Sequence, residues 1–173
     1  MDLLLRFKPW QLFVILLIPW VLSWFSSFTG IWDSLFLLIY VGWAYAIGIK
    51  MNALIPENKR PGVKLFKINF WLLVVFTVLV VNILVYTRAI MDNNTIFSIV
   101  FAAVFIYLIL SIWMFAARML ESMIEGYVVN RSDALKGFFC FWFFPFGIWY
   151  IQPAVQRVLA KYEQGNPEVN LPG

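Results

Sequence analysis

The chain has 173 residues, of which 63% are hydrophobic and only 13% are charged, and its formal net charge is +4. Water-soluble domains contain about 45–50% apolar and about 25% charged residues, so this composition excludes a soluble globular domain. The chain has no histidine and one cysteine. It therefore lacks the residues of His-ligated zinc or haem sites, of Ser-His and Cys-His nucleophile pairs and of an intrachain disulfide. The composition predicts a single-domain, all-α integral membrane protein.

Four stretches are almost free of charge and long enough to cross the roughly 30 Å hydrocarbon core of a bilayer as helices. We expect these spans at about 10–28, 34–54, 68–87 and 95–117. Pro19 should kink the first span, because proline removes one helical hydrogen bond. Thr29 and Gly30 should lie in a short turn, and the second helix should begin near Asp33 or Ser34, where a carboxylate suits a helix N-terminus.

The loop between the second and third spans predicts the orientation. Counted from Lys50 to Lys67, it contains five basic residues and one acidic residue, with two prolines and a glycine. An excess of Lys and Arg marks cytoplasmic loops. With four spans, both termini are then cytoplasmic as well.

The segment of about 134–161 has two interpretations. No charge occurs between Gly137 and Gln156, which is long enough for a fifth span. Pro145 and Gly147, however, divide it into pieces of the length found in re-entrant or interfacial segments. A hairpin that re-enters the membrane leaves 12 of the 13 basic residues on the cytoplasmic side, whereas a fifth span leaves ten. We therefore expect four spans and a re-entrant aromatic hairpin, with five spans as the alternative.

The second half of this segment is amphipathic. Ile148, Ile151 and Val155 recur at helical spacing, with Gln152 and Gln156 off that stripe. We expect an in-plane amphipathic helix that ends near residue 161, followed by a disordered tail at 164–173.

The string from Phe143 to Pro153, F-F-P-F-G-I-W-Y-I-Q-P, together with K-L-F-K-I-N at 64–69, resembles a group of small polytopic membrane proteins of Bacteroidota-type bacteria. The resemblance covers the C-terminal hairpin and the basic loop well, and the rest only as a pattern of spans. It implies a bacterial inner-membrane setting and transfers no catalytic residue. Ala154 occupies a position where that group suggests a basic residue.

The aromatic hairpin supplies the candidate interaction residues. They are Trp142, Phe144, Pro145, Gly147, Trp149, Gln152 and Pro153. Such a segment could strain one leaflet as a wedge or offer an apolar face to a partner protein. The alternative is plain burial against the third and fourth spans.

Other polar groups give weaker signals. Glu121 and Glu125 share a helix face with Arg118 just beyond the fourth span, either as a carboxylate pair that handles cations or as solvated surface residues. Asn82 is expected to bond another helix or, with Tyr107 and Ser111, to line a polar path.

The preferred hypothesis is a non-enzymatic accessory or interaction subunit whose hairpin engages a partner or the inner leaflet. An oligomeric pore or small-solute transporter that uses Asn82 is the first alternative. An intramembrane lipid-modifying enzyme that uses Glu121 and Glu125 is the second. The expected partners are the bilayer, a membrane protein or further copies of the chain, and not nucleic acid. We assign no catalytic residue, metal or cofactor.

Overall fold

The computed structural model describes residues 2–25, 29–81 and 95–164, and every regular element in these ranges is a helix. The helices are α1 (Asp2–Arg6), α2 (Pro9–Phe25), α3 (Thr29–Leu54), η1 (Glu57–Lys59), α4 (Lys64–Val75), η2 (Phe76–Val81), α6 (Thr95–Glu125), α7 (Leu135–Trp142) and α8 (Phe146–Glu163). The predicted all-α class is confirmed for these residues.

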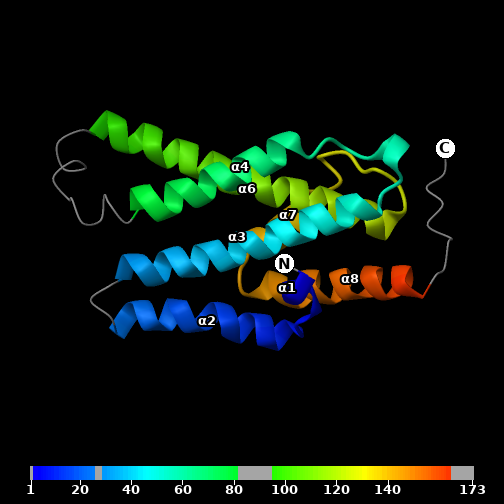
Figure 1. Ribbon diagram of the computed structural model, residues 1–173, viewed down its shortest axis with the longest axis horizontal. Coiled ribbons are helices and arrows are strands. Elements are labelled where there is room, and N and C mark those ends of the chain that lie inside the picture. The colour runs from blue at the N-terminus through cyan, green and yellow to red at the C-terminus, as the bar shows by residue number, and fades with distance from the viewer. Residues whose placement is uncertain (1, 26–28, 82–94, 165–173) are drawn as a thin grey trace.

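The four longer segments, α2, α3, α4 with η2, and α6, run side by side along the long axis of the molecule (Figure 1). The central helix, α3, packs on α2 and on α6, and α4 packs on α6. Gly48 of α3 also permits a close contact with α4, because a Cβ there would lie 2.6 Å from the ring of Phe66. That ring stacks on Phe115 of α6 with 4.2 Å between centroids.

Within the described residues, two helical stretches are long and apolar enough to cross a bilayer: Gly30–Leu54 and Ile99–Glu125. The apolar helix α2 is shorter, at 17 residues. At its N-terminus the Gln11 side chain accepts a hydrogen bond from the Lys8 N–H at 2.9 Å, which is one half of a capping box. These features agree with the membrane class that the composition predicts.

The predicted start of the second span is wrong by several residues. Helix α3 begins at Thr29, so Gly30 lies within the helix and Asp33 lies on its exposed side, beyond the first turn. Glycine costs about 1 kcal/mol relative to alanine in a helix, and no proline interrupts this segment, so the helix continues through it. The helix of the predicted third span, α4, likewise begins before residue 68, at Lys64.

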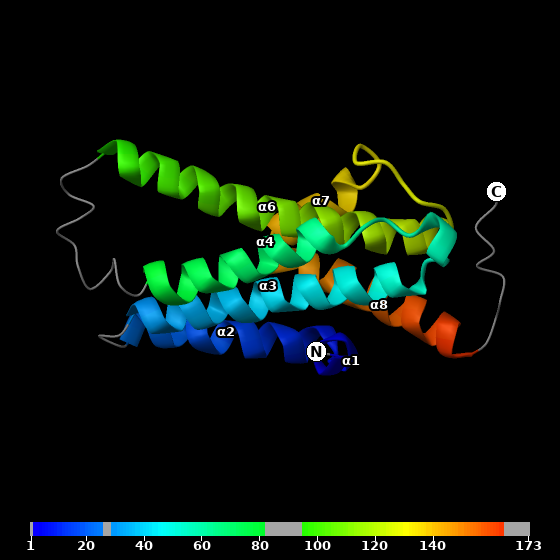
Figure 2. The same ribbon diagram turned by 45° about the horizontal axis from the view of Figure 1, so that its top comes forward.

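Helices α7 and α8 form a helical hairpin that folds back beside the bundle. Helix α7 packs on α6 and α8, while α8 contacts α2 and α1. In Figures 1 and 2, the C-terminal part of α8 extends beyond the N-terminal end of α2. The hairpin thus occupies a place in the bundle that the shorter α2 leaves open.

Helix α8 packs on α1, α2, α6 and α7, and the expectation that it lies in the plane of the membrane stays a prediction. Its apolar stripe of Ile148, Ile151 and Val155 is buried in the core of the protein. The amphipathic pattern is thus explained by burial against neighbouring helices, which produces the same periodicity as a lipid interface.

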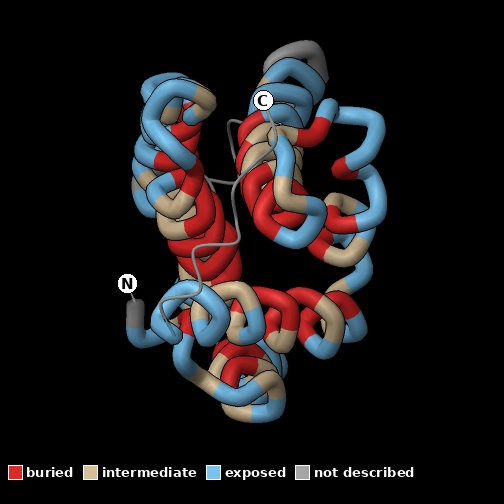
Figure 3. Tube along the Cα trace, turned by 90° about the vertical axis from the view of Figure 1, so that its right-hand side faces the viewer, coloured by how far each residue is buried: buried red, intermediate tan, exposed pale blue. Residues whose placement is uncertain are grey.

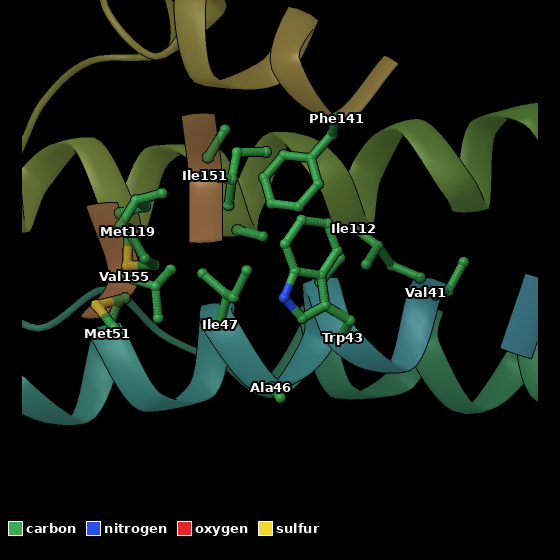
Figure 4. Close-up of a cluster of buried hydrophobic side chains, with 14 of the residues drawn as sticks. Val41, Trp43, Ala46, Ile47, Met51, Ile112, Met119, Phe141, Ile151 and Val155 are labelled. Atoms are coloured by element: carbon green, nitrogen blue, oxygen red, sulfur yellow. The ribbon is translucent and has the colours of Figure 1, made fainter. Parts of the chain in front are cut away.

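Buried residues lie on the helix faces that point toward the middle of the bundle (Figure 3). In the core, Phe141 of α7 points toward Trp43 of α3, and their ring centroids are 5.4 Å apart (Figure 4). Ile112 of α6 and Ile151 of α8 close around them. The hairpin therefore contributes central residues to the core and is more than a peripheral addition.

Candidate functional site

The hairpin turn follows directly from Pro145. Proline has no N–H, so the Phe141 carbonyl, four residues earlier, loses its helical donor. In the structure, the Tyr40 hydroxyl of α3 donates a buried hydrogen bond to that carbonyl. Helix α7 ends at Trp142, the Phe144–Pro145 peptide is cis, and α8 begins one residue later.

Gly147 determines how closely the two helices of the hairpin, α7 and α8, approach each other. A Cβ at this position would lie 1.5 Å from the Cys140 carbonyl oxygen, so no residue with a side chain fits the observed backbone. The Gly147 N–H donates to the Phe143 carbonyl at 3.0 Å, which extends the contact into the turn. Gly147 is therefore a packing residue, buried between α7 and α8.

Gln152 is fully buried and joins three helices. Its Oε1 accepts a hydrogen bond from the Trp43 indole N–H at 2.8 Å. Its Nε2 faces the C-terminal end of α1, at 2.7 Å from the Phe7 carbonyl and 3.1 Å from those of Leu4 and Leu5. The interpretation of Gln152 as a residue available to a partner is wrong, because every polar atom of the amide is used inside the protein.

Two other candidate residues are also mainly structural. Pro153 lies inside α8, where it is half-buried. Phe144 is half-buried at the turn, where its ring lies 5.2 Å from Tyr40, 5.4 Å from Phe36 and 6.5 Å from Phe13 between centroids. These contacts hold the tip of the hairpin against α2 and α3.

The outer face of the hairpin remains strongly apolar. Five aromatic side chains of the hairpin, which we call the aromatic ridge, have exposed fractions from 49% to 80%: Phe139, Trp142, Phe143, Phe146 and Trp149. The charged residues of this region are exposed too, but they lie before Gly137 or after Gln156, away from the turn. The hairpin thus has an apolar tip and a charged base.

The hairpin is partly supported as the burial hypothesis proposed, because α6, the helix of the predicted fourth span, packs on α7 and α8. The other support comes from α2 and α3, the helices of the first two predicted spans. Phe13 of α2 contacts Trp149 at 5.0 Å between centroids, and Tyr40 and Trp43 of α3 bind the hairpin by hydrogen bonds. Part of each arm is buried and part is exposed, so burial alone does not explain the aromatic content.

Glu121 and Glu125 lie in different environments. Glu121 is only 5% exposed and lies beneath Gly137, where an added Cβ would be 3.0 Å from the Glu121 Oε1, whereas Glu125 is exposed. The interpretation of both as solvated residues is therefore wrong for Glu121. The Arg118 guanidinium donates to the Val129 carbonyl at 2.8 Å, and so braces the loop after α6.

The surroundings of Glu121 favour a structural role. The carboxylate lies against the first turn of α7, where a helix N-terminus favours negative charge. Its Oε1 has no hydrogen-bond partner. The nearby Lys136 ammonium lies 5.0 Å from the centroid of the Tyr150 ring, and its hydrogen bond to that residue raises the pKa of Lys136. Among the described residues, no three His, Cys, Asp or Glu side chains are placed to hold a metal.

The residues proposed to line a polar path are not brought together where the structure describes them. Asn82 lies outside the described residues. Tyr107 is 57% exposed. Ser111 accepts a hydrogen bond from the Asn69 amide at 2.9 Å and donates to the Leu108 carbonyl at 2.8 Å, so it links α4 to α6.

Sequence reasoning missed Tyr40 and Trp43, which hold the hairpin from α3. The proline signal shows that the Phe141 carbonyl needs a donor, but it does not identify a hydroxyl about 100 residues away. Comparison of the chain with protein-family models, with curated proteins and with solved structures gives no match. The resemblance to the Bacteroidota-type membrane proteins therefore stays a prediction.

Proposed function

We propose that the protein is a non-enzymatic accessory subunit of the bacterial inner membrane, and that the aromatic ridge is its contact surface for a partner membrane protein. One observation carries this proposal. The ridge is exposed, while the same hairpin is fixed from behind by Tyr40, Trp43 and the close approach at Gly147. A rigidly supported aromatic surface is typical of the core of a protein interface.

We further propose four membrane crossings, with the hairpin entering the cytoplasmic leaflet. The start of α7 and the end of α8 lie toward the same end of the bundle as the basic loop between α3 and α4 (Figure 1). The apolar tip and charged base suit a segment that dips into a leaflet and returns. Irregular backbone at the turn is compatible with this depth, because Tyr40 supplies the donor that Pro145 removes.

Contact with a protein explains more of the ridge than contact with lipid alone. Lipid chains adapt to any apolar surface, so a lipid-facing helix needs no tightly held backbone behind it. Tryptophan and phenylalanine supply large contact areas, and such residues carry much of the binding energy in protein interfaces. The occupant we propose is an apolar helix of another membrane protein, which would lie against the tip of the hairpin.

Site-specific photo-crosslinking tests this proposal. A photoreactive side chain at Phe143 should capture one defined protein in native membranes, and a Phe146→Ala/Trp149→Ala variant should reduce the yield. The matched control places the same side chain at Trp71, an exposed apolar residue of α4, with Leu72→Ala/Val75→Ala as the paired change. If Phe143 captures only lipid, or the same proteins as Trp71, the proposal is wrong.

No specific observation favours the pore or the enzyme as a second function. A path through Tyr107 and Ser111 would need both side chains directed at one space, but the first is exposed and the second binds Asn69. A lipid-modifying centre would need Glu121 and Glu125 in one accessible place, but Glu121 is buried.

A further inference from the structure

We propose that α1 is a latch that holds the hairpin in the bundle. Helix α1 is only five residues long, and so short a helix is not stable in isolation. It is held in place by contacts with α3 and α8. Its hydrophobic anchor, Leu5, is 1% exposed.

Two amides of α8 satisfy the carbonyls at the C-terminal end of α1. The last carbonyls of any helix lack donors within the helix. Here the Gln152 amide lies within 3.1 Å of the Leu5 carbonyl, and the Gln156 amide donates to the Phe7 carbonyl at 2.7 Å. These side chains cap α1 from another helix, about 145 residues away along the chain.

The Gln152 amide also links α1 to α3, which supports the hairpin. Gln152 uses its oxygen for the Trp43 indole of α3 and its nitrogen for α1. If α1 leaves, a fully buried amide nitrogen loses its acceptors, and a buried donor without a partner is strongly unfavourable. Loss of α1 therefore favours movement of α8 away from the helices on which it packs. The hairpin and the N-terminal helix should open together.

The native cysteine reports this movement. Cys140 is the only cysteine in the chain and is half-buried in α7, where its backbone carbonyl faces Gly147 and its side chain packs against the core. Movement of the hairpin away from the core should therefore expose the thiol. The rate of maleimide labelling of the full chain in lipid nanodiscs then measures how often the hairpin opens.

Two substitutions on α1 form a matched pair. Leu5→Ala removes the buried anchor, whereas Leu3→Ala removes a side chain that is 67% exposed on the same short helix. We expect Leu5→Ala to raise the labelling rate of Cys140 about tenfold, equivalent to about 1.4 kcal/mol of opening free energy. Leu3→Ala should leave the rate at that of the natural chain. Equal rates for the two variants would overturn the latch.

A second reporter separates hairpin opening from loss of the whole fold. In a Cys140→Ser background, Ala116→Cys places a thiol in the buried core on α6. Leu5→Ala should leave labelling at this position unchanged. If both reporters become accessible together, α1 stabilises the whole bundle and is not a latch. Gln156→Ala, which removes the bond to Phe7 alone, should raise labelling of Cys140 and not of the core reporter.

Discussion

At the scale of single residues, the Phe141 carbonyl shows how one proline determines contacts far away in the chain. Pro145 removes the helical donor, and the Tyr40 hydroxyl replaces it from another helix. A buried carbonyl without a donor in an apolar environment is unfavourable. The position of Tyr40 on α3 is therefore required by the turn, although nothing in the local sequence of α3 indicates this.

Replacement of Tyr40 by phenylalanine should be destabilising, because the ring is kept while the Phe141 carbonyl loses its donor. We expect the free energy of unfolding to fall by about 1–3 kcal/mol. Tyr107→Phe removes a hydroxyl from an exposed tyrosine of α6 and is the control. Denaturation of both variants in the same detergent measures the difference. Equal stability of the two would show that the Tyr40 hydroxyl is not needed at the turn.

Gly147 and Gly42 form a second matched pair. A Cβ at Gly147 would collide with the Cys140 carbonyl, whereas a Cβ at Gly42 would meet nothing within 4 Å. Gly147→Ala should force α7 and α8 apart and reduce stability by at least about 1–3 kcal/mol, as overpacking does. Gly42→Ala should be neutral or stabilising, because alanine favours the helix. Thermal unfolding of both variants measures these changes in stability. If Gly147→Ala is as stable as the natural chain, the close approach of α7 and α8 at this position is contradicted.

At the scale of elements, α4 and α6 are joined by a hydrogen bond between Asn69 and Ser111. The sequence analysis predicts a bond of this kind for Asn82, which lies outside the described residues, and the structure shows one for Asn69. A double-mutant cycle with Asn69→Ala and Ser111→Ala should give a coupling energy of about 0.6 kcal/mol, which is typical for such bonds in membranes. A coupling of zero would mean that each side chain acts independently and that the bond contributes nothing to the contact.

The surroundings of α8 could not be predicted from its sequence, for a physical reason. An apolar stripe at helical spacing shows that one face is covered, but it does not identify lipid or protein as the cover. Ile148, Ile151 and Val155 face other helices, and Gln152, which lies off the stripe, is also buried because α1 and Trp43 satisfy its polar atoms. Long-range polar contacts of this kind leave no periodic signal in the sequence.

At the scale of the whole molecule, the composition and the helix-breaking residues were sufficient to predict the all-helical class and the position of the hairpin turn. The low charge content predicted the helical membrane class, and Pro145 with Gly147 predicted the break between α7 and α8. The start of α3 and the set of helices that support the hairpin were not predictable in the same way. Both depend on contacts between helices that are distant in sequence, such as Tyr40 with Phe141 and Trp43 with Gln152.

The side of the membrane that each end of the hairpin occupies is the most direct test of this account. In a Cys140→Ser background, single cysteines at Asp33, Glu57 and Lys161 can be labelled with an impermeant reagent from either side of sealed membranes. The three positions are exposed and sample one end of the bundle, the basic loop and the end of α8. Four crossings with a re-entrant hairpin predict that Glu57→Cys and Lys161→Cys react only from the cytoplasmic side and Asp33→Cys only from the other. Reaction of Lys161→Cys from the same side as Asp33→Cys would contradict the account.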